Sequence, residues 1–264
     1  MDAPRNRLAI SINHGAPFET GGKDISGDSF IVALNLESGK EDYRVNLAKT
    51  SKGRYGGFQD IAHASDGTAF VVGTYPTSIL RINPNGDKVD EWFASPLNKT
   101  STTAGFTGIV PHNGWLVVSD DESGKLFRLD MTKEKGTPEE VAWTGKTETN
   151  ARVGTALDGA FLPPKYSGMI LLVNCEQGTV VVRSSDTEWK QAEIIGTIAN
   201  KHAGDGGSAT CTSQIEDRVF VVTEFFGDAK KAENGTTIVG SRVDFPLHDI
   251  TDELEQIVKQ ATKV

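Results

Sequence analysis

The sequence predicts an all-β fold, a β-propeller built of four-stranded blades. Three observations predict it. A short apolar run recurs along the 264 residues, the segments between the copies are rich in turn residues, with 28 glycines in the chain, and the connections lack helical periodicity. Repeated units of about 50 residues, each with four short strands, are typical of propeller blades. The copies of the run are 8–13, 69–74, 115–120, 169–174 and 219–224.

Each copy of the run is expected to be the second strand of a blade. Four copies are preceded by a first strand, all five are followed by a third, and an outer fourth strand follows in several. The predicted first strands are 57–61, 105–109, 156–160 and 208–211, the third strands are 30–35, 79–83, 126–130, 180–183 and 238–242, and two fourth strands are 43–47 and 89–93.

Two other architectures fit this pattern less well. A parallel α/β fold needs helices between its strands. A two-sheet sandwich also has short strands, but it does not repeat their order so evenly. The even repeat therefore favours the propeller.

The two ends of the chain differ from the repeat. The first copy lacks a first strand and the last ends after Val243, so we expect a propeller over 1–248. Residues 249–264 are expected to form a helix, with Asp249 or Thr251 as its cap. We expect a six-bladed protein in the full-length family, with about one blade missing here through N-terminal shortening. The helix has an apolar stripe of Ile250, Leu254, Ile257, Val258 and Ala261.

The composition of the chain argues against some classes of binding partner. The formal net charge of −9 argues against binding to nucleic acid or to an anionic membrane. No apolar stretch approaches the ~18 residues of a membrane span, and we expect no signal peptide at Met1. We expect a monomer that binds a small molecule, cytoplasmic from this start and secreted in a longer form. The two cysteines, Cys175 and Cys211, either pair or remain reduced.

The strand order predicts where a site would lie. In each blade, the start of the first strand and the end of the second meet at one face, around the central channel. Strand ends are polar in most β proteins, because turn residues satisfy their own backbone, so single residues there are often structural. A face crowded with carboxylates, histidines and arginines is nevertheless a candidate site. It is expected to hold Asn13, Gln59, Asp60, Thr74, Thr107, Asp120, Asp158, Asn174, Thr210 and Glu224, with His14, Arg54, Tyr55, Arg152, His202 and Asp205 on its loops.

Several other features are expected to be structural. Arg81, Arg128 and Arg183 recur in the third strand and are expected to face solvent or to pair along the blade. The segment 14–27 is either a lid or an ordinary insertion. The sequence has no zinc-helix signature, nucleophile elbow or phosphate loop. Inter-blade packing is expected of Trp92, Trp115, Trp143 and Trp189.

Residues 59–67, with Asp158 and Gly159, resemble the senescence-marker and gluconolactonase propellers. The resemblance implies a six-bladed lactonase whose calcium or zinc is held by inner-strand residues, with Asp158 as the matching aspartate. Thr107 stands where an asparagine is expected in that family. Since threonine is a weak neutral ligand, such a metal site would have too few oxygen donors.

A resemblance over essentially the whole chain is to the fungal proteins of trichothecene gene clusters, carried by residues 2–15 and 56–61. It implies a role in making a sesquiterpenoid mycotoxin and in plant infection. It also implies a cyclase without a cofactor, which closes the oxygen-containing ring of a sesquiterpenoid precursor.

Such a ring closure needs an acid for the leaving allylic hydroxyl, a base for the attacking hydroxyl, and a pocket that fixes both. We expect Asp158 as the acid, Glu224 as the second choice, and His14 or His202 as the base. A metal-dependent lactonase and a non-catalytic propeller that binds a partner protein remain as alternatives. The expected substrate-binding residues are Arg54, Tyr55, Gln59, Asp60, Thr107, Asp120, Arg152 and Asn174.

Overall fold

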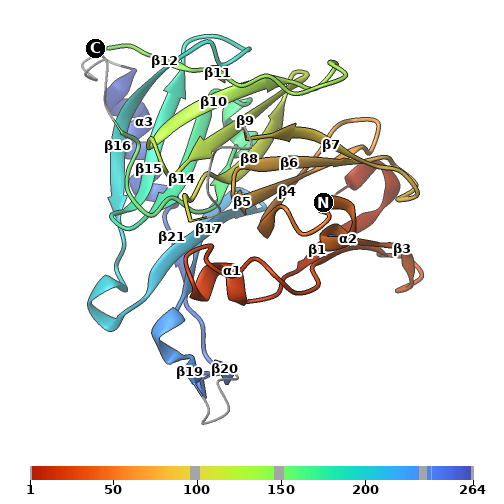
Figure 1. The fold of residues 1–264 in the computed structure, drawn as a ribbon. Coiled ribbons are helices and arrows are strands. Elements are labelled where there is room, and N and C mark those ends of the chain that lie inside the picture. The colour runs from red at the N-terminus through yellow and green to blue at the C-terminus, as the bar shows by residue number, and fades with distance from the viewer. Residues whose placement is uncertain (1, 96–101, 146–151, 232–236, 239, 263–264) are drawn as a thin grey trace. The chain divides into compact units, whose positions relative to one another are not determined.

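The computed structural model describes residues 2–95, 102–145, 152–231, 237–238 and 240–262, and it consists mostly of β-strands (Figure 1). The strands form small sheets of the β-propeller blade type, which confirms the predicted fold class. The chain divides into two compact units, Met1–Val141 and Ala142–Val264. Within the described residues, no helix is long and apolar enough to span a membrane.

The first unit contains three antiparallel sheets, in the orders β1-β2-β3, β4-β5-β6-β7 and β11-β10-β9-β8. The run that recurs in the sequence is the second strand of its blade in each four-stranded sheet, as predicted. The strands are β1 (Arg7–Ile12), β2 (Phe30–Asn35), β3 (Glu41–Asn46), β4 (Gly56–His63), β5 (Ala69–Tyr75), β6 (Ser78–Ile82), β7 (Val89–Ala94), β8 (Phe106–His112), β9 (Trp115–Asp120), β10 (Lys125–Asp130) and β11 (Glu139–Glu140).

Short helical turns interrupt the first unit at points where only strands and loops were expected. They are α1 (Ala16–Glu19), α2 (Leu47–Ser51) and the 3-10 turn η1 (Ala3–Arg5). The predicted strand 43–47 therefore ends one residue early. Asn46 is the reason, because its side chain accepts a hydrogen bond from the Lys49 amide at 3.0 Å and so caps α2.

The core of the first unit lies between blades. Trp92 on β7 is fully buried and packs with Phe70 of its own blade, at a ring-centroid distance of 4.8 Å. The same cluster includes Phe106, Leu116 and Leu129 of the next blade. Inter-blade packing was predicted for Trp92, and the structure confirms it.

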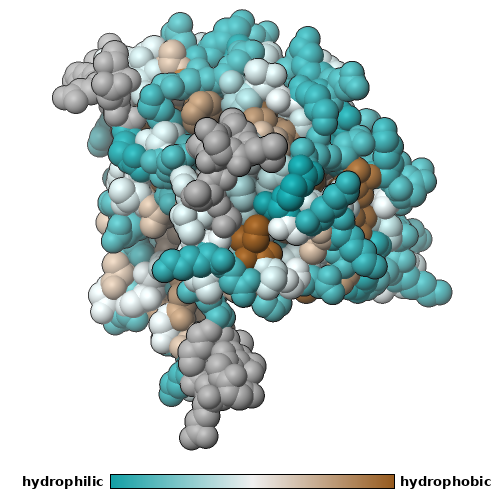
Figure 2. All heavy atoms as spheres, in the orientation of Figure 1, coloured by the Kyte–Doolittle hydropathy of each residue, from teal (hydrophilic) through white to brown (hydrophobic). Residues whose placement is uncertain are grey.

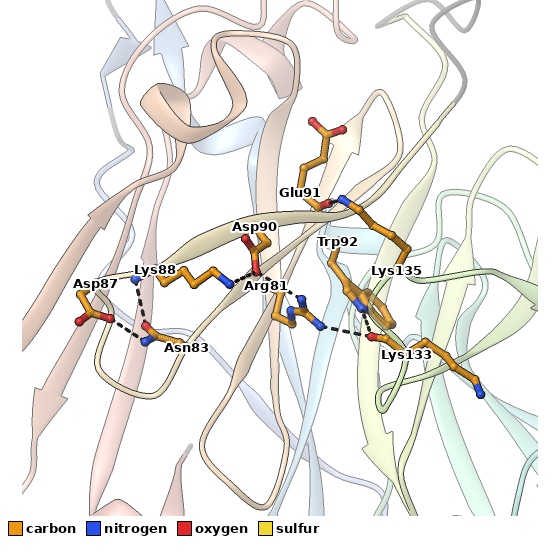
Figure 3. Close-up of polar contacts among 9 residues, drawn as sticks. All are labelled: Arg81, Asn83, Asp87, Lys88, Asp90, Glu91, Trp92, Lys133 and Lys135. Atoms are coloured by element: carbon orange, nitrogen blue, oxygen red, sulfur yellow. Dashed lines mark hydrogen bonds and ion pairs between the residues drawn. The ribbon is translucent and has the colours of Figure 1, made fainter.

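Each of the repeated arginines pairs with an acid directly opposite on the fourth strand of its blade. Arg81 lies opposite Asp90, and their Nη2 and Oδ2 atoms are 3.3 Å apart. In Figure 3, Arg81 and the Trp92 indole both point to the Lys133 carbonyl, at 3.2 and 3.0 Å. The predicted pairing along the blade is thus confirmed. The equivalent pairs are Arg128–Glu139 at 2.6 Å and Arg183–Glu193 at 2.5 Å.

The second unit has a five-stranded sheet, a three-stranded sheet and a separate hairpin. The orders are β12-β16-β15-β14-β13, β17-β18-β21 and β19-β20, and among the described strands only β12 pairs in parallel, with β16. The strands are β12 (Ala142–Trp143), β13 (Ala160–Phe161), β14 (Ile170–Cys175), β15 (Gly178–Ser184), β16 (Gln191–Ala199), β17 (Ser208–Ile215), β18 (Arg218–Glu224), β19 (Lys230–Lys231), β20 (Thr237–Ile238) and β21 (Leu247–Asp249), with 3-10 turns η2 (Pro164–Tyr166), η3 (Ala203–Asp205) and η4 (Phe226–Asp228).

Two predicted strands of the second unit are wrong in part. The predicted strand 238–242 does not pair with β18. Instead, Ile238 belongs to the β19-β20 hairpin, and β21 pairs with β18. Pairing of β21 is favoured because Ile250, the residue directly after β21, places a fully buried side chain in the core. The predicted strand 156–160 is regular only at Ala160, since Ala156 has a left-handed φ of 49°.

Helix α3 (Thr251–Ala261) is the last element and packs against β16 and β18 within the second unit. The predicted stripe is borne out by Ile250 and Leu254, which are buried, and by Ile257, which packs against the same cluster. The predicted cap Asp249 is the last residue of β21. Its Oδ1 accepts bonds from the amide and the hydroxyl of Thr251, at 2.9 and 2.6 Å.

Exposed large apolar side chains occur in a few groups. On the face seen in Figure 2 the described surface is mostly hydrophilic, with small separate hydrophobic areas. In the second unit the exposed groups lie mainly after β18. They include Phe226, Ile238, Val243, Phe245 and Leu247.

Candidate functional site

The first strands β4, β8 and β17 each carry a β-bulge close to their start. A bulge leaves backbone groups without a ladder partner and turns a side chain out of the regular alternation, and bulges are common next to active sites. Each bulge lies near the start of its own first strand, the part of a blade where a site was predicted. The residues that they displace are Gln59, which is half-buried, Thr107 with Gly108, and Thr210.

In the first unit, polar side chains near the ends of the second strands bind the carbonyls that precede the bulges. The Ser11 hydroxyl donates to the Phe58 carbonyl at 2.6 Å, and the Asn13 amide donates to the same oxygen. The buried Thr74 hydroxyl donates to the Phe106 carbonyl at 2.9 Å. Each bond joins the second strand of one blade to the first strand of the next, so these polar strand ends hold neighbouring blades together.

Two predicted site residues of the first unit also form internal hydrogen bonds, Asp60 with the next blade and Thr107 within its own blade. Asp60 Oδ2 accepts from the Ile109 amide of the next blade at 2.9 Å, and its Oδ1 accepts from the Ile61 amide at 2.8 Å. Thr107 is buried, and its hydroxyl lies 2.9 Å from that of Ser119. Their carboxylate and hydroxyl groups are bound within the protein.

The remaining predicted binding residues of the first unit have structural contacts as well. Asp120 Oδ2 accepts from the amide and hydroxyl of Ser123, at 3.0 and 2.6 Å, and so closes a turn. Tyr55 is 4% exposed in the core, and Arg54 pairs with Glu91 of β7. Glu91 lies on β7, at the opposite edge of the sheet from β4, and the predicted contact of Arg54 with substrate stays a prediction.

The segment predicted as a lid or insertion folds back on itself. Its exposed His14 accepts a bond from the Ala16 amide at Nδ1, at 3.3 Å, which favours the tautomer with the proton on Nε2. The imidazole lies against Gly27, whose φ of 96° and missing Cβ allow this approach. Phe18 of α1 packs edge-on against Tyr75, at a ring-centroid distance of 5.8 Å. His14 thus lies on a folded loop whose aromatic residue covers the end of β5.

In the second unit, Asn174 is a fully buried hydrogen-bonding centre. Its Nδ2 donates to the Gly159 carbonyl and to the Thr212 hydroxyl, each at 3.1 Å. Its Oδ1 accepts from Thr179 at 2.8 Å and from Thr212 at 3.2 Å. The amide therefore has both donors and its acceptor in use, and its predicted contact with substrate stays a prediction.

Asp158 lies beside this centre, at the junction of two blades. Its amide donates to the Asn174 carbonyl at 2.9 Å, and the next amide, that of Gly159, donates to the carbonyl of the bulge residue Thr210, also at 2.9 Å. These bonds fix the backbone of Asp158 although it belongs to no regular strand. Asp158 is half-buried, and Arg152, six residues earlier, is exposed.

His202 and Glu224 lie at the same end of the β17-β18 hairpin but on different sides. Ser208 pairs with Glu224, and the following pair contains Thr223. Because side chains alternate along a strand, Glu224 and Thr223 point to opposite faces. A Cβ on Gly207 would contact both Thr223 and His202, which places His202 on the Thr223 face.

Beside His202 lies a cluster that the sequence analysis missed. The Phe225 ring is 6.5 Å from His202 and 6.5 Å from Phe245, centroid to centroid. The Arg242 guanidinium carbon lies 3.6 Å above the Phe225 ring centroid, and Arg242 also forms an ion pair with Asp228. The sequence signal for this cluster was the pair of aromatic residues, Phe225 and Phe226, directly after Glu224. Arg242 was not among the expected site residues because it was expected to lie in the strand 238–242.

The resemblance to the gluconolactonase propellers implies a bound calcium or zinc ion, which needs several ligands close together. Among the residues that the structure describes, no group of three or more His, Cys, Asp or Glu is placed to hold a metal ion. Cys175 is buried, Cys211 is exposed, and both are free thiols.

Comparison with known proteins gives two relatives and a solved structure. No family model matches the chain. "Trichothecene biosynthesis protein 14" of Trichoderma arundinaceum is 31% identical over 97% of this chain and 69% of its own length. "Core trichothecene cluster (CTC) protein 14" of Fusarium sporotrichioides is 26% identical over 95% of this chain and 65% of its own length. The crystal structure of the major Malassezia sympodialis allergen Mala s 1 superposes with a TM-score of 0.73 at 22% identity, over 92% of this chain and 73% of that one, and shows a shared fold.

Proposed function

The chain belongs to the family of trichothecene biosynthesis protein 14, and from this we propose that it closes an oxygen-containing ring in a sesquiterpenoid toxin precursor. Family membership supports the pathway, and the step is our proposal. The chain spans about two thirds of the length of the two relatives, so the activity is proposed for the fold that they share.

The position of Asp158 is the observation that carries the proposal. Its backbone is fixed to Asn174 of β14, and through Gly159 to the bulge of β17, although Asp158 itself belongs to no regular strand. A carboxyl group held rigidly at such a junction is suited to proton transfer, which depends on geometry before acidity.

The proposed reaction is an intramolecular displacement. Asp158 protonates an allylic hydroxyl, the C–O bond breaks, and water leaves. A second hydroxyl of the same substrate attacks the allylic carbon, a new C–O bond forms, and its proton passes to a base. The precursor loses one water and no oxidant or reductant is needed. Holding both hydroxyls in reacting geometry supplies much of the rate enhancement.

The base is assigned to His202, with Glu224 as the second acid at the same end of the hairpin. His202 lies next to the Phe225 ring, so its surroundings are partly apolar and suit a hydrocarbon skeleton. Glu224 lies on the other face of β18 and can act without contacting His202. His14, the alternative base, belongs to the first unit.

The proposal is tested by incubating the protein with hydroxylated sesquiterpenoid precursors and measuring ring closure against the spontaneous rate. We expect the Asp158→Asn variant to lose about 10²- to 10⁴-fold in rate, the usual contribution of general acid catalysis. Glu216→Gln, on the exposed turn at the far end of the same hairpin, is the matched control and should react normally. Normal turnover by both Asp158→Asn and Glu224→Gln would exclude this mechanism.

We propose that the toxin made by the pathway, and not the protein itself, acts in plant infection. A fungal strain carrying Asp158→Asn should then lose toxin and infectivity together. Full infectivity without toxin would instead support a propeller that binds a partner protein. This outcome separates the two classes of function.

A further inference from the structure

We propose that Arg242 binds an oxygen atom of the substrate, and that Asp228 and Phe225 hold it in position for this. The inference rests on the proposed function, because it adds a specificity-determining residue to the same site. Arg242 was expected to be part of a strand, and the structure places it instead on the irregular segment between β20 and β21.

Two contacts fix the guanidinium. Arg242 Nε donates to Asp228 Oδ2 at 2.5 Å, and Nη2 donates to Asp228 Oδ1 at 3.2 Å, so the two planar groups meet side by side. The guanidinium also lies 3.6 Å above the Phe225 ring, which is 5% exposed and therefore a rigid support. Within the described residues, no acceptor binds the remaining Nη1 amino group. That group has two N–H donors available for a ligand.

The charges around Arg242 indicate what kind of ligand it binds. The hydrogen bonds with Asp228 raise the pKa of Arg242 and lower that of the carboxyl, so both remain charged, and Asp205 is a second acid close enough to act on Arg242. Arg242 and the nearby Lys230, taken with the two carboxylates, leave no net positive charge to attract a phosphate or carboxylate. A neutral oxygen, in a hydroxyl, ether or carbonyl group, is the ligand that fits.

The surroundings of Arg242 favour an apolar skeleton. Phe225 lies beneath the guanidinium, and the ring centroids of Phe245 and His202 are each 6.5 Å from that of Phe225. Phe245 is 49% exposed and so offers ring surface to a ligand. Aromatic surface beside a fixed donor is typical of sites for hydrocarbon skeletons with a few oxygen functions. A hydroxylated sesquiterpenoid has this chemistry.

Arg242 can be replaced without removing a blade. It follows Asp228 by 14 residues, and the β19-β20 hairpin between them projects from the β17-β18-β21 sheet (Figure 1). Both side chains of the ion pair are 34% exposed. Exposed ion pairs contribute little to stability, so variants at this pair should fold.

The test uses binding and turnover with the full chain. The probes are a hydroxylated sesquiterpenoid and the sesquiterpene hydrocarbon of the same skeleton, which has no oxygen for Arg242 to bind, and both are measured by calorimetric titration. For Arg242→Gln we expect the hydroxylated probe to bind about 10- to 100-fold more weakly, as for the loss of one charge-assisted hydrogen bond. In turnover KM should rise with kcat little changed. Asp228→Asn should give a smaller loss in binding, since it only loosens the position of Arg242. The control is Lys230→Gln, which removes an exposed positive charge nearby.

The possible outcomes keep this inference apart from the function it rests on. If the wild-type protein binds neither probe and closes no ring, the proposed function fails. If the wild type binds and Arg242→Gln binds equally well, the role of Arg242 fails alone. Equal weakening for both probes in Arg242→Gln would show a structural effect of the ion pair and would also overturn the inference.

Discussion

The side chains of Asn174 and Thr212 bind each other across the junction of two blades, with the Thr212 hydroxyl 3.1 Å from Nδ2 and 3.2 Å from Oδ1 of the amide. Asn174 also accepts from Thr179 and donates to the Gly159 carbonyl. One buried amide thus joins β14, β15, the segment that carries Asp158, and β17. The proposed acid depends on this amide for its position.

Replacing Asn174 with alanine should therefore destabilise the second unit. The hydroxyls of Thr179 and Thr212 and the Gly159 carbonyl would remain buried without this partner, which costs about 1–3 kcal/mol for such groups. Urea unfolding followed by circular dichroism measures the loss. The control is Gln256→Ala on the exposed side of α3, expected to change stability by less than about 0.5 kcal/mol. Equal stability of the two variants would contradict the role of Asn174.

Replacing Gly196 with alanine should weaken the packing of α3 on β16. A Cβ at Gly196 would lie 2.8 Å from Cγ2 of Ile257, closer than real contacts allow. Overpacking of this kind costs typically about 1–3 kcal/mol. Gly204→Ala is the control, because no atom of a described residue other than its chain neighbours lies within 4 Å of its Cβ position. We expect a lower thermal midpoint for Gly196→Ala only, and a normal midpoint would mean that α3 moves aside without cost.

Alkylation should distinguish the two thiols. Burial raises the pKa of the Cys175 thiol, and its side chain is almost inaccessible, whereas Cys211 is exposed on β17. Since the thiolate reacts, iodoacetamide should modify Cys211 first in the native protein and both thiols in denaturant. Peptide mass mapping over time measures this order. Rapid labelling of Cys175 in the native protein would show that the end of β14 opens.

The repeat made the fold predictable, while the site was predictable only in part. Period and turn residues identified the second strands, and the recurring arginines could be assigned because Arg81 and its equivalents meet acids across the sheet. The polar strand ends, such as Thr74, could not be separated from binding residues by sequence. Whether a threonine binds a backbone carbonyl or a ligand depends on the bulge in the neighbouring blade, which no local pattern encodes. Arg242 was missed for a related reason, since its partners lie 14 or more residues away.

His63 should make the stability of the first unit depend on acid pH. It ends β4, its Nδ1 is buried, and no described residue binds that atom. Burial lowers the pKa of His63 to about 4 from the ordinary value of 6.5, with a smaller opposing effect from Asp2 and a further lowering by Arg5. The neutral ring is therefore the form that fits the folded protein.

The direction of the effect follows from proton binding. Between pH 6.5 and about 4 the unfolded chain binds a proton at His63 that the folded protein does not, so stability falls as the pH falls through this range. The loss approaches about 3 kcal/mol below pH 4, and stability is unaffected by this group above pH 7. A His63→Phe variant should show a flatter profile of unfolding free energy between pH 7 and pH 4, measured by urea titration at each pH. Parallel profiles for the variant and the wild-type protein would mean that His63 is protonated in the folded state, and its burial would then need a carboxylate partner such as Asp2.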